Sequence, residues 1–183
     1  MTSASTAPAA GGLLWAFHTG FAEYIARLDD GRITVEDGAT AQPDGRVFFP
    51  TAPTPPAAAS DRAADTPAVL WSGLGTLQFT GHHGMLAVTL SSPAVLLADG
   101  RYLLTVDDPF EPGQRMPLAD LGPTGLPNSQ PDTLPTPLHV AEPRLTEEGA
   151  DLFFGHYHWG TPLAPMELAP TAAPTAAPST PEA

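Results

Sequence analysis

The sequence predicts a mainly β fold, an antiparallel sandwich or barrel-like domain with one or two short helices. Three observations favour this class. Between residues 32 and 106 the chain divides into short apolar runs bounded by Gly, Pro or Asp, a pattern typical of sandwiches and barrels. A single stretch near the N-terminus has helical periodicity instead. The length of 183 residues is enough for one domain with a sizeable core.

Residues 13–28 are expected to form the helix. An apolar stripe recurs there at spacings of three and four: Phe17, Phe21, Tyr24, Ile25 and Leu28. The turn-forming residues Asp29, Asp30 and Gly31 should end the helix. Tyr24 is therefore expected on the same face as Phe21 and Leu28, towards the interior or a pocket, with Arg27 nearby on the helix flank.

After residue 31 the apolar period changes to two, the period of a strand. Strands are expected at residues 32–36, 46–49, 69–71, 75–80, 85–90, 94–97 and 102–106. The Pro/Ala-rich residues 50–67 are expected to be a loop, and residues 109–143 mostly loop.

The predicted domain boundaries follow composition. We expect a flexible N-terminus at residues 1–11, a folded domain at 12–167 and a disordered tail at 168–183. The chain from Pro165 onward is rich in Pro, Ala and Thr, which is typical of a linker and not of a core.

Charge and composition exclude several classes of function. There are 20 acidic residues against 7 basic ones, a formal net charge of −13, so no nucleic-acid partner and no adsorption to anionic membranes is expected. With no cysteine, disulfides and thiolate chemistry are excluded. Apolar runs are too short for membrane insertion or for a recognisable secretory signal, so the chain as written is expected in the cytoplasm.

Two histidine clusters are candidates for chemistry. The first is Gly81-His82-His83-Gly84, which interrupts a strand pattern, and the second is His156-Tyr157-His158. Neighbouring strand residues face opposite sides, so only one of His82 and His83 is expected to point into a given pocket. No zinc or catalytic motif surrounds them. On the residues alone, a structural role and a ligand role stay open for these histidines and for Tyr24.

Three blocks in order carry a resemblance to a known family. The first is Gly-Leu-Leu-Trp-Ala-Phe-His-Thr-Gly-Phe-Ala-Glu-Tyr-Ile at 12–25, continued by Gly-Arg-Ile-Thr, Asp-Gly-Ala and Phe-Phe-Pro up to residue 50. The second runs from Leu77 through the Gly-His-His-Gly segment to Pro93, and the third is Phe-Phe-Gly-His-Tyr-His-Trp-Gly-Thr-Pro-Leu-Ala-Pro at 153–165. Together they resemble HtaA domains, which are actinobacterial haem-binding modules.

The resemblance implies a mostly β fold and a haem site. It implies Tyr24 as the axial ligand to the iron of ferric haem b, with His82, or else His83, hydrogen-bonded to that tyrosine. A Phe-Tyr pair near the haem in the family corresponds to His156 and Tyr157 here.

Further residues of the expected site correspond less directly to the family pattern. Where the family places a serine near the haem, four residues before the tyrosine, this chain has Gly20. Phe21, Tyr157 and the Phe153–Phe154 region are expected to cover the porphyrin face, and Arg27 is the nearest cation in the sequence for a propionate.

The implied partners are haem and another haem-binding protein or an importer component, and a homodimer stays open. Family members are usually secreted or displayed at the cell surface, which contrasts with the missing signal segment. An alternative function is an HtaA-fold interaction module that does not bind haem, because Gly20 and His156 depart from the family pattern. An enzyme is the least favoured reading, since no catalytic constellation stands out.

Hard ferric iron suits a hard anionic oxygen such as phenolate, and a hydrogen-bonded histidine can orient that oxygen. Reduction of the iron should weaken the bond, which suits a protein that carries haem and hands it over.

Overall fold

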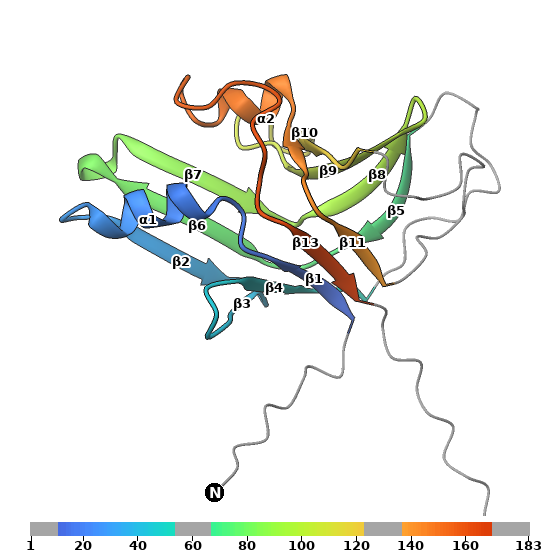
Figure 1. Cartoon of the computed structure of the whole chain (residues 1–183), viewed down its shortest axis with the longest axis horizontal. Helices are drawn as coiled ribbons and strands as arrows, with labels where there is room; N and C mark the ends of the chain where they lie inside the picture. Colours follow the sequence, from blue (N-terminus) through green and yellow to red (C-terminus); the bar gives the residue numbers. More distant parts are fainter. Residues whose placement is uncertain (1–10, 54–66, 123–136, 170–183) are drawn as a thin grey trace, which may run out of the picture.

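The structure is a computed structural model that describes residues 11–53, 67–122 and 137–169. Within those ranges the chain forms 13 strands in three antiparallel sheets, together with two α-helices (Figure 1). The expected mainly β class is confirmed. No helix among the described residues is long and apolar enough to span a membrane.

Two sheets have five strands each. The first has the order β11 (Leu138–Val140), β13 (Met166–Ala169), β1 (Gly12–Trp15), β4 (Val47–Pro50) and β3 (Thr40–Ala41). The second has the order β12 (Arg144–Leu145), β10 (Arg115–Asp120), β9 (Arg101–Asp107), β8 (Ala94–Ala98) and β5 (Ala68–Ser72).

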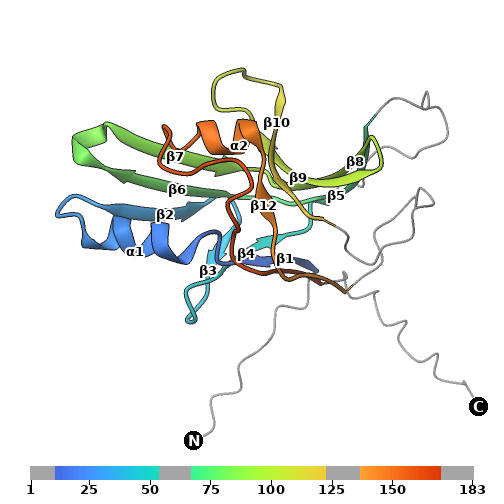
Figure 2. The same ribbon diagram turned by 45° about the horizontal axis from the view of Figure 1, so that its top comes forward.

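The third sheet, with three strands, supports the candidate site. Its order is β2 (Arg32–Glu36), β6 (Thr76–Gly81) and β7 (Leu86–Ser91). Helix α1 (Thr19–Arg27) contacts β2 and β6, and the short helix α2 (Glu147–Asp151) packs on β10 and β12. Figure 2 shows α1 running alongside β2, at the end of the molecule away from β5 and β8.

The first helix is shorter than predicted. Residues 12–15 form β1, paired with β4 on one side and β13 on the other, because Leu13 and Trp15 bury their side chains between those strands. Phe17 then adopts a left-handed backbone (φ 57°), which separates the strand from the helix. The prediction of helix at residues 13–18 was wrong, and Leu28 is the C-cap.

Two regions predicted as loop or tail contain strands. In residues 109–143, β10 and β11 form, and a register shift between Pro117 and Ala119 lets β10 hold a proline. Beyond residue 165, β13 buries Met166 and Leu168 almost completely, so the tail does not begin before residue 170. The expectations for residues 1–10, for most of the 50–67 loop and for 170–183 lie outside the described residues.

An aromatic cluster joins the core to the end of the molecule where α1 lies. Phe17 lies 5.5 Å from Phe79 and 5.5 Å from Phe153, and Phe21 lies 5.0 Å from Phe79, all as ring-centroid separations. These rings are nearly fully buried. Helix α1 is therefore held on a rigid apolar base, which fixes the side chains on its outer edge.

Candidate functional site

Helix α1 places Tyr24 at the edge of the buried cluster. Phe21 and Ile25 point into the core, whereas Tyr24 is 39 % exposed, with its ring 6.4 Å from that of Phe21. The predicted interior face of the helix therefore carries Tyr24 at its margin, where a phenol oxygen can meet a ligand from solvent.

His18 caps the beginning of this helix. Its Nδ1 accepts a hydrogen bond from the backbone N–H of Phe21 at 3.1 Å, which satisfies one of the unpaired amides of the first turn. Partial burial lowers the pKa of His18, so the neutral ring that the cap needs is favoured.

The two neighbouring histidines lie in the tight loop between β6 and β7. Residues His82, His83, Gly84 and Met85 join these strands, with a 3-10 turn at His82–Gly84. The strand geometry expected for His82 and His83 was wrong, because both have left-handed backbones (φ 52° and 57°). Such a conformation costs roughly 1–2 kcal/mol for each non-glycine residue, so other contacts must hold this turn.

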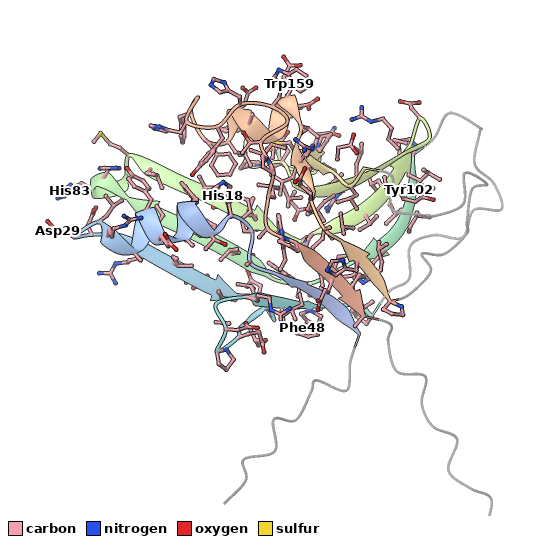
Figure 3. All side chains as sticks on the ribbon, in the orientation of Figure 1. His18, Asp29, Phe48, His83, Tyr102 and Trp159 are labelled. Atoms are coloured by element: carbon pink, nitrogen blue, oxygen red, sulfur yellow. The ribbon has the colours of Figure 1, made fainter. Side chains whose placement is uncertain are left out.

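The structure brings Tyr24 and His82 together and leaves His83 apart. The Tyr24 phenol oxygen lies 2.5 Å from Nε2 of His82, within hydrogen-bonding distance. The His83 side chain is 94 % exposed and lies at the outer end of the molecule (Figure 3). Of the two histidines, His82 is the one that can orient the phenol.

Two glycines allow this approach between helix and hairpin. A Cβ on Gly31 would lie 1.8 Å from the carbonyl oxygen of Ile25, and a Cβ on Gly81 would lie 2.6 Å from Cδ1 of Leu28. A side chain at position 31 would displace the turn after α1 from the Ile25 backbone, and one at position 81 would force the Leu28 side chain to move. The contact between Tyr24 and His82 depends on that close packing.

A cavity of about 190 Å³ opens beside the Tyr24–His82 pair. Its apolar lining consists of Phe21, Met85, Leu86, Val88, Phe153 and Phe154. Its polar lining consists of Tyr24, His82 and His156. Met85 (81 % exposed) and Phe154 (62 % exposed) stand at the mouth, so the cavity continues into an apolar rim. The arrangement suits a flat apolar ligand with one group that takes an oxygen donor.

Three other residues expected at the site lie behind or outside the cavity. Tyr157 packs behind it, 5.4 Å from Phe153 and 4.7 Å from His18 between ring centroids, and burial raises its pKa. Arg27 donates to the carbonyl oxygen of Glu23 at 3.1 Å and pairs with its carboxylate at 3.6 Å. Gly20 is exposed on α1, where a Cβ would lie 3.3 Å from the His18 ring.

Sequence reasoning missed Asp30 and His18. Asp30 was assigned only to the turn that ends the helix, yet its carboxylate accepts hydrogen bonds from the backbone N–H groups of His82 and His83. These contacts join residues more than 50 positions apart, so no local pattern indicates them. His18 was missed because the helix was predicted to begin at residue 13, which places His18 in its interior, and histidine is not among the usual cap residues.

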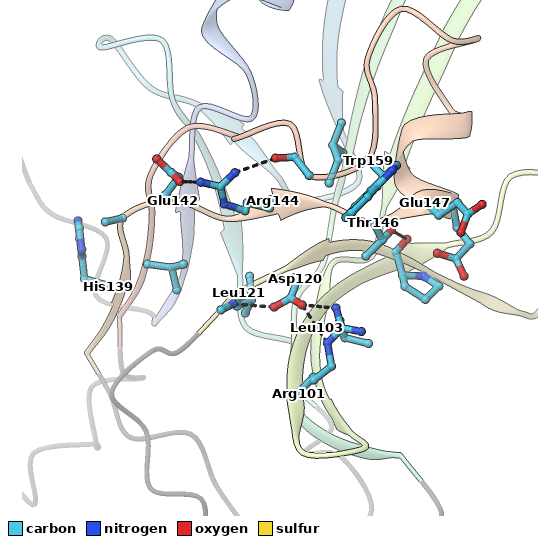
Figure 4. Close-up of a pocket in the computed structure, with 17 residues that line it drawn as sticks. Arg101, Leu103, Asp120, Leu121, His139, Glu142, Arg144, Thr146, Glu147 and Trp159 are labelled. Atoms are coloured by element: carbon cyan, nitrogen blue, oxygen red, sulfur yellow. Dashed lines mark hydrogen bonds and ion pairs between the residues drawn. The ribbon is translucent and has the colours of Figure 1, made fainter.

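A larger hollow lies elsewhere, with a volume of about 980 Å³ (Figure 4). It is a groove between β9–β10 and the segment around β12, with Trp159 on its rim. Its arginines are already paired: Arg101 with Asp120, and Arg144 with Glu142. Burial opposes ionisation of Asp120, but hydrogen bonds from Arg101 and from the Gly122 N–H outweigh it and lower the pKa of Asp120.

Neither hollow holds a cluster of metal-ligating side chains. Among the described residues, no group of three or more His, Asp or Glu side chains is placed to hold a metal ion. The chemistry available in the smaller cavity is therefore that of one phenol, its hydrogen-bonded imidazole, the second imidazole of His156 and an apolar wall. This set can supply an oxygen or nitrogen ligand to a metal that brings its other ligands with it.

Comparisons with known proteins agree with the fold. The family model for HtaA matches residues 10–169. The N-terminal domain of HtaA from Corynebacterium glutamicum is 22 % identical, with 88 % of this chain and 97 % of that chain covered and a TM-score of 0.60. The C-terminal domain of the same protein is 20 % identical, covering 86 % and 93 %, with a TM-score of 0.57.

A third solved structure is the heme binding protein HtaB from the same organism, 20 % identical, covering 87 % and 91 %, with a TM-score of 0.56. Among curated proteins, none matches the chain. At these identities the solved structures establish a shared fold.

Proposed function

The chain belongs to the HtaA family, and on that premise we propose that it binds haem in the cavity between α1 and the β6–β7 loop, with the phenol oxygen of Tyr24 as the ligand to iron. The observation that carries the proposal is the 2.5 Å contact between that oxygen and Nε2 of His82 beside an apolar cavity. The similarity to a heme binding protein, HtaB, supports the same ligand.

The residues present fit such a ligand. A porphyrin ring needs apolar cover, and Phe21, Val88 and Phe153 supply a buried wall beside the phenol. The cavity is smaller than the roughly 300–1,000 Å³ typical of enclosed ligand sites. The exposed Met85 and Phe154 extend the apolar surface beyond it, so part of a macrocycle would rest on the rim.

Ferric haem would supply a hard, positively charged iron that favours an anionic oxygen donor. Tyr24 must therefore lose its proton when the ligand binds. Nε2 of neutral His82 is placed to accept that proton from the phenol O–H. The resulting Nε2–H then donates a hydrogen bond back to the phenolate and holds it in one orientation.

The surrounding residues set the strength of this bond. The buried aromatic wall excludes water from one side of the phenolate, which strengthens its attraction to a cation. His156 adds a further imidazole to the cavity lining. Arg27 is engaged by Glu23, and we propose that it turns to a propionate only by giving up that exposed and therefore weak pair.

A site of this kind suits uptake, transfer or storage of ferric haem b. Reduction lowers the charge on iron and weakens a phenolate bond, which would release the ligand to an acceptor. The acceptor is proposed to be another haem-binding protein, an importer component or a second copy of this chain.

The test is a titration of the apo protein with hemin, followed in the visible spectrum, for wild type and Tyr24→Phe. The proposal predicts saturable binding with a high-spin tyrosinate-type ferric spectrum, and its loss or strong shift in Tyr24→Phe. The phenylalanine keeps the ring and removes the oxygen, so the fold is retained. A wild-type spectrum equal to that of free hemin would instead assign the chain to the haem-less interaction class.

A further inference from the structure

We propose that Asp30 is the positioning residue of this site, because its carboxylate holds the β6–β7 loop in the one conformation that brings His82 to Tyr24. The inference rests on the proposed haem site and adds a residue to it. Asp30 itself touches neither the phenol nor the cavity.

The contact is a two-point clamp on the loop backbone. Oδ1 of Asp30 accepts the N–H of His82 at 3.1 Å, and Oδ2 accepts the N–H of His83 at 2.5 Å. Each carboxylate oxygen thus takes one of two successive amides.

The clamped residues are the two that adopt left-handed backbones. A non-glycine residue leaves that conformation unless its surroundings hold it, and here two occur in succession. Relaxation of either residue would rotate the peptide that carries the His82 imidazole. The clamp therefore acts on the direction of the side chain that meets Tyr24.

Asp30 also connects the two halves of the site by a short path. It follows the helix that carries Tyr24 and directly precedes Gly31, which packs against the carbonyl of Ile25 on that helix. Holding the loop from this point sets it relative to α1 itself. An equal clamp from a distant element would allow the helix and the loop to drift apart.

The charge of Asp30 is maintained by the same contacts. The pKa of its carboxyl lies below the ordinary value, chiefly because the His83 N–H donates to it; desolvation opposes this effect, and the His82 N–H lowers the pKa further. The carboxylate is therefore ionised at neutral pH, and charged acceptors make the stronger hydrogen bonds.

The neighbouring residue offers a matched control. Asp29 has the same charge and lies one position earlier at the same end of the molecule (Figure 3). Its side chain makes no hydrogen bond or ion pair to any part of the chain that the structure describes, and it is exposed. Asp29→Ala removes the same charge from the same turn without touching the clamp.

The experiment compares hemin affinity and the ligand spectrum in wild type, Asp30→Ala, Asp30→Asn and Asp29→Ala. Loss of a residue that orients a metal ligand typically reduces affinity by about 10–100-fold, and we expect Asp30→Ala to fall in that range. Asp30→Asn keeps one acceptor oxygen and should fall in between. Asp29→Ala should match wild type.

A double-mutant cycle separates positioning from general stability. If Asp30 acts through His82, removing Asp30 in a His82→Ala background costs no further affinity, because the imidazole it positions is already absent. A full additional loss in that background would overturn the inference. So would wild-type affinity and spectrum in Asp30→Ala.

If the protein does not bind haem at all, a separate measurement still tests the role of Asp30. If wild type does not bind hemin, the clamp is tested in the apo protein by NMR of the histidine rings and of the His82 and His83 amides. Positioning predicts that Asp30→Asn shifts the His82 ring signal and speeds exchange of both amides, while Asp29→Ala does neither. Unchanged signals in a folded Asp30→Asn protein would overturn the inference.

Discussion

The two hollows on this molecule differ in what their polar groups already do. In the groove of about 980 Å³, both arginines are paired with carboxylates, and the Asp120 carboxylate accepts a backbone amide as well. In the cavity of about 190 Å³, one phenol and one imidazole meet each other beside an aromatic wall and stand open to solvent.

The difference shows that volume does not mark the site. A groove whose charges are satisfied within the protein has little to offer a ligand unless pairs are broken first. The smaller cavity instead offers a ligand the phenol oxygen of Tyr24, which its hydrogen bond to His82 orients beside an apolar wall. The buried aromatic rings beneath α1 also help to hold that oxygen in place.

The largest expected effect concerns the buried aromatic cluster beneath α1. Phe153 is nearly fully buried, stacks on Phe17 and meets Phe21 edge-on. Phe153→Ala should destabilise the protein by about 3–5 kcal/mol, as is typical of a large aromatic removed from a core. The half-buried Leu103 of the groove wall is the counterpart, and Leu103→Ala should cost about 1 kcal/mol.

Urea unfolding of both variants measures this contrast. Equal losses in the free energy of unfolding would show that the wall of the cavity is no more rigidly packed than the wall of the groove.

A smaller effect concerns pH. The pKa of His18 is lowered by burial, so its folded form prefers the neutral ring. The stability that this ring contributes is present above about pH 6.5, the ordinary value for histidine, and is lost as pH falls through the lower folded value. Protonation also removes the Nδ1 acceptor that caps α1, a contribution of about 1 kcal/mol.

His18→Asn keeps a capping acceptor and cannot titrate in this range. Wild type should therefore lose stability relative to His18→Asn between pH 7 and 5. The Arg101–Asp120 pair of the groove should be unaffected over that interval, because the pKa of Asp120 is lowered and the pairing is lost only as pH falls below about 3.8. If the free energies of unfolding of the two proteins changed with pH in parallel, His18 would not act as a titrating cap of α1.

The smallest expected effect is on the groove rim. Trp159 is 77 % exposed, so Trp159→Ala should change the free energy of unfolding by no more than about 0.5 kcal/mol and leave hemin affinity unchanged. Thermal unfolding and the hemin titration measure both. Loss of hemin binding in this variant would show that the groove, and not the cavity beside Tyr24, holds the ligand.

Much of the fold could be predicted from local patterns. The strands of the third sheet alternate apolar and polar residues between turn residues, and the predicted ranges agree with β2, β6 and β7 to within one residue. β13 could not be predicted this way, because Met166 and Leu168 stand between prolines and are buried in a strand that lies between β1 and β11. β1 has four residues, and its apolar run continues into the helical stripe.

The periodicity of the sequence predicted the helical half of the candidate site, whereas His82 and His156, which also line the cavity, were expected only from the family resemblance. The apolar stripe identified the helix face that carries Tyr24. The choice between His82 and His83 stayed open, because it depends on a left-handed turn that their residue types do not favour. The Asp30 contacts depend on how the hairpin lies against the end of α1, which is a tertiary property.

Resonance Raman spectroscopy of the hemin-loaded protein tests the central claim most directly. With excitation in the phenolate-to-iron band, the account predicts phenolate modes that shift when tyrosine is ring-deuterated and that vanish in Tyr24→Phe. Trp159→Phe should retain them. A loaded protein without such modes, or with modes that survive Tyr24→Phe, would contradict the assignment of Tyr24 as the ligand.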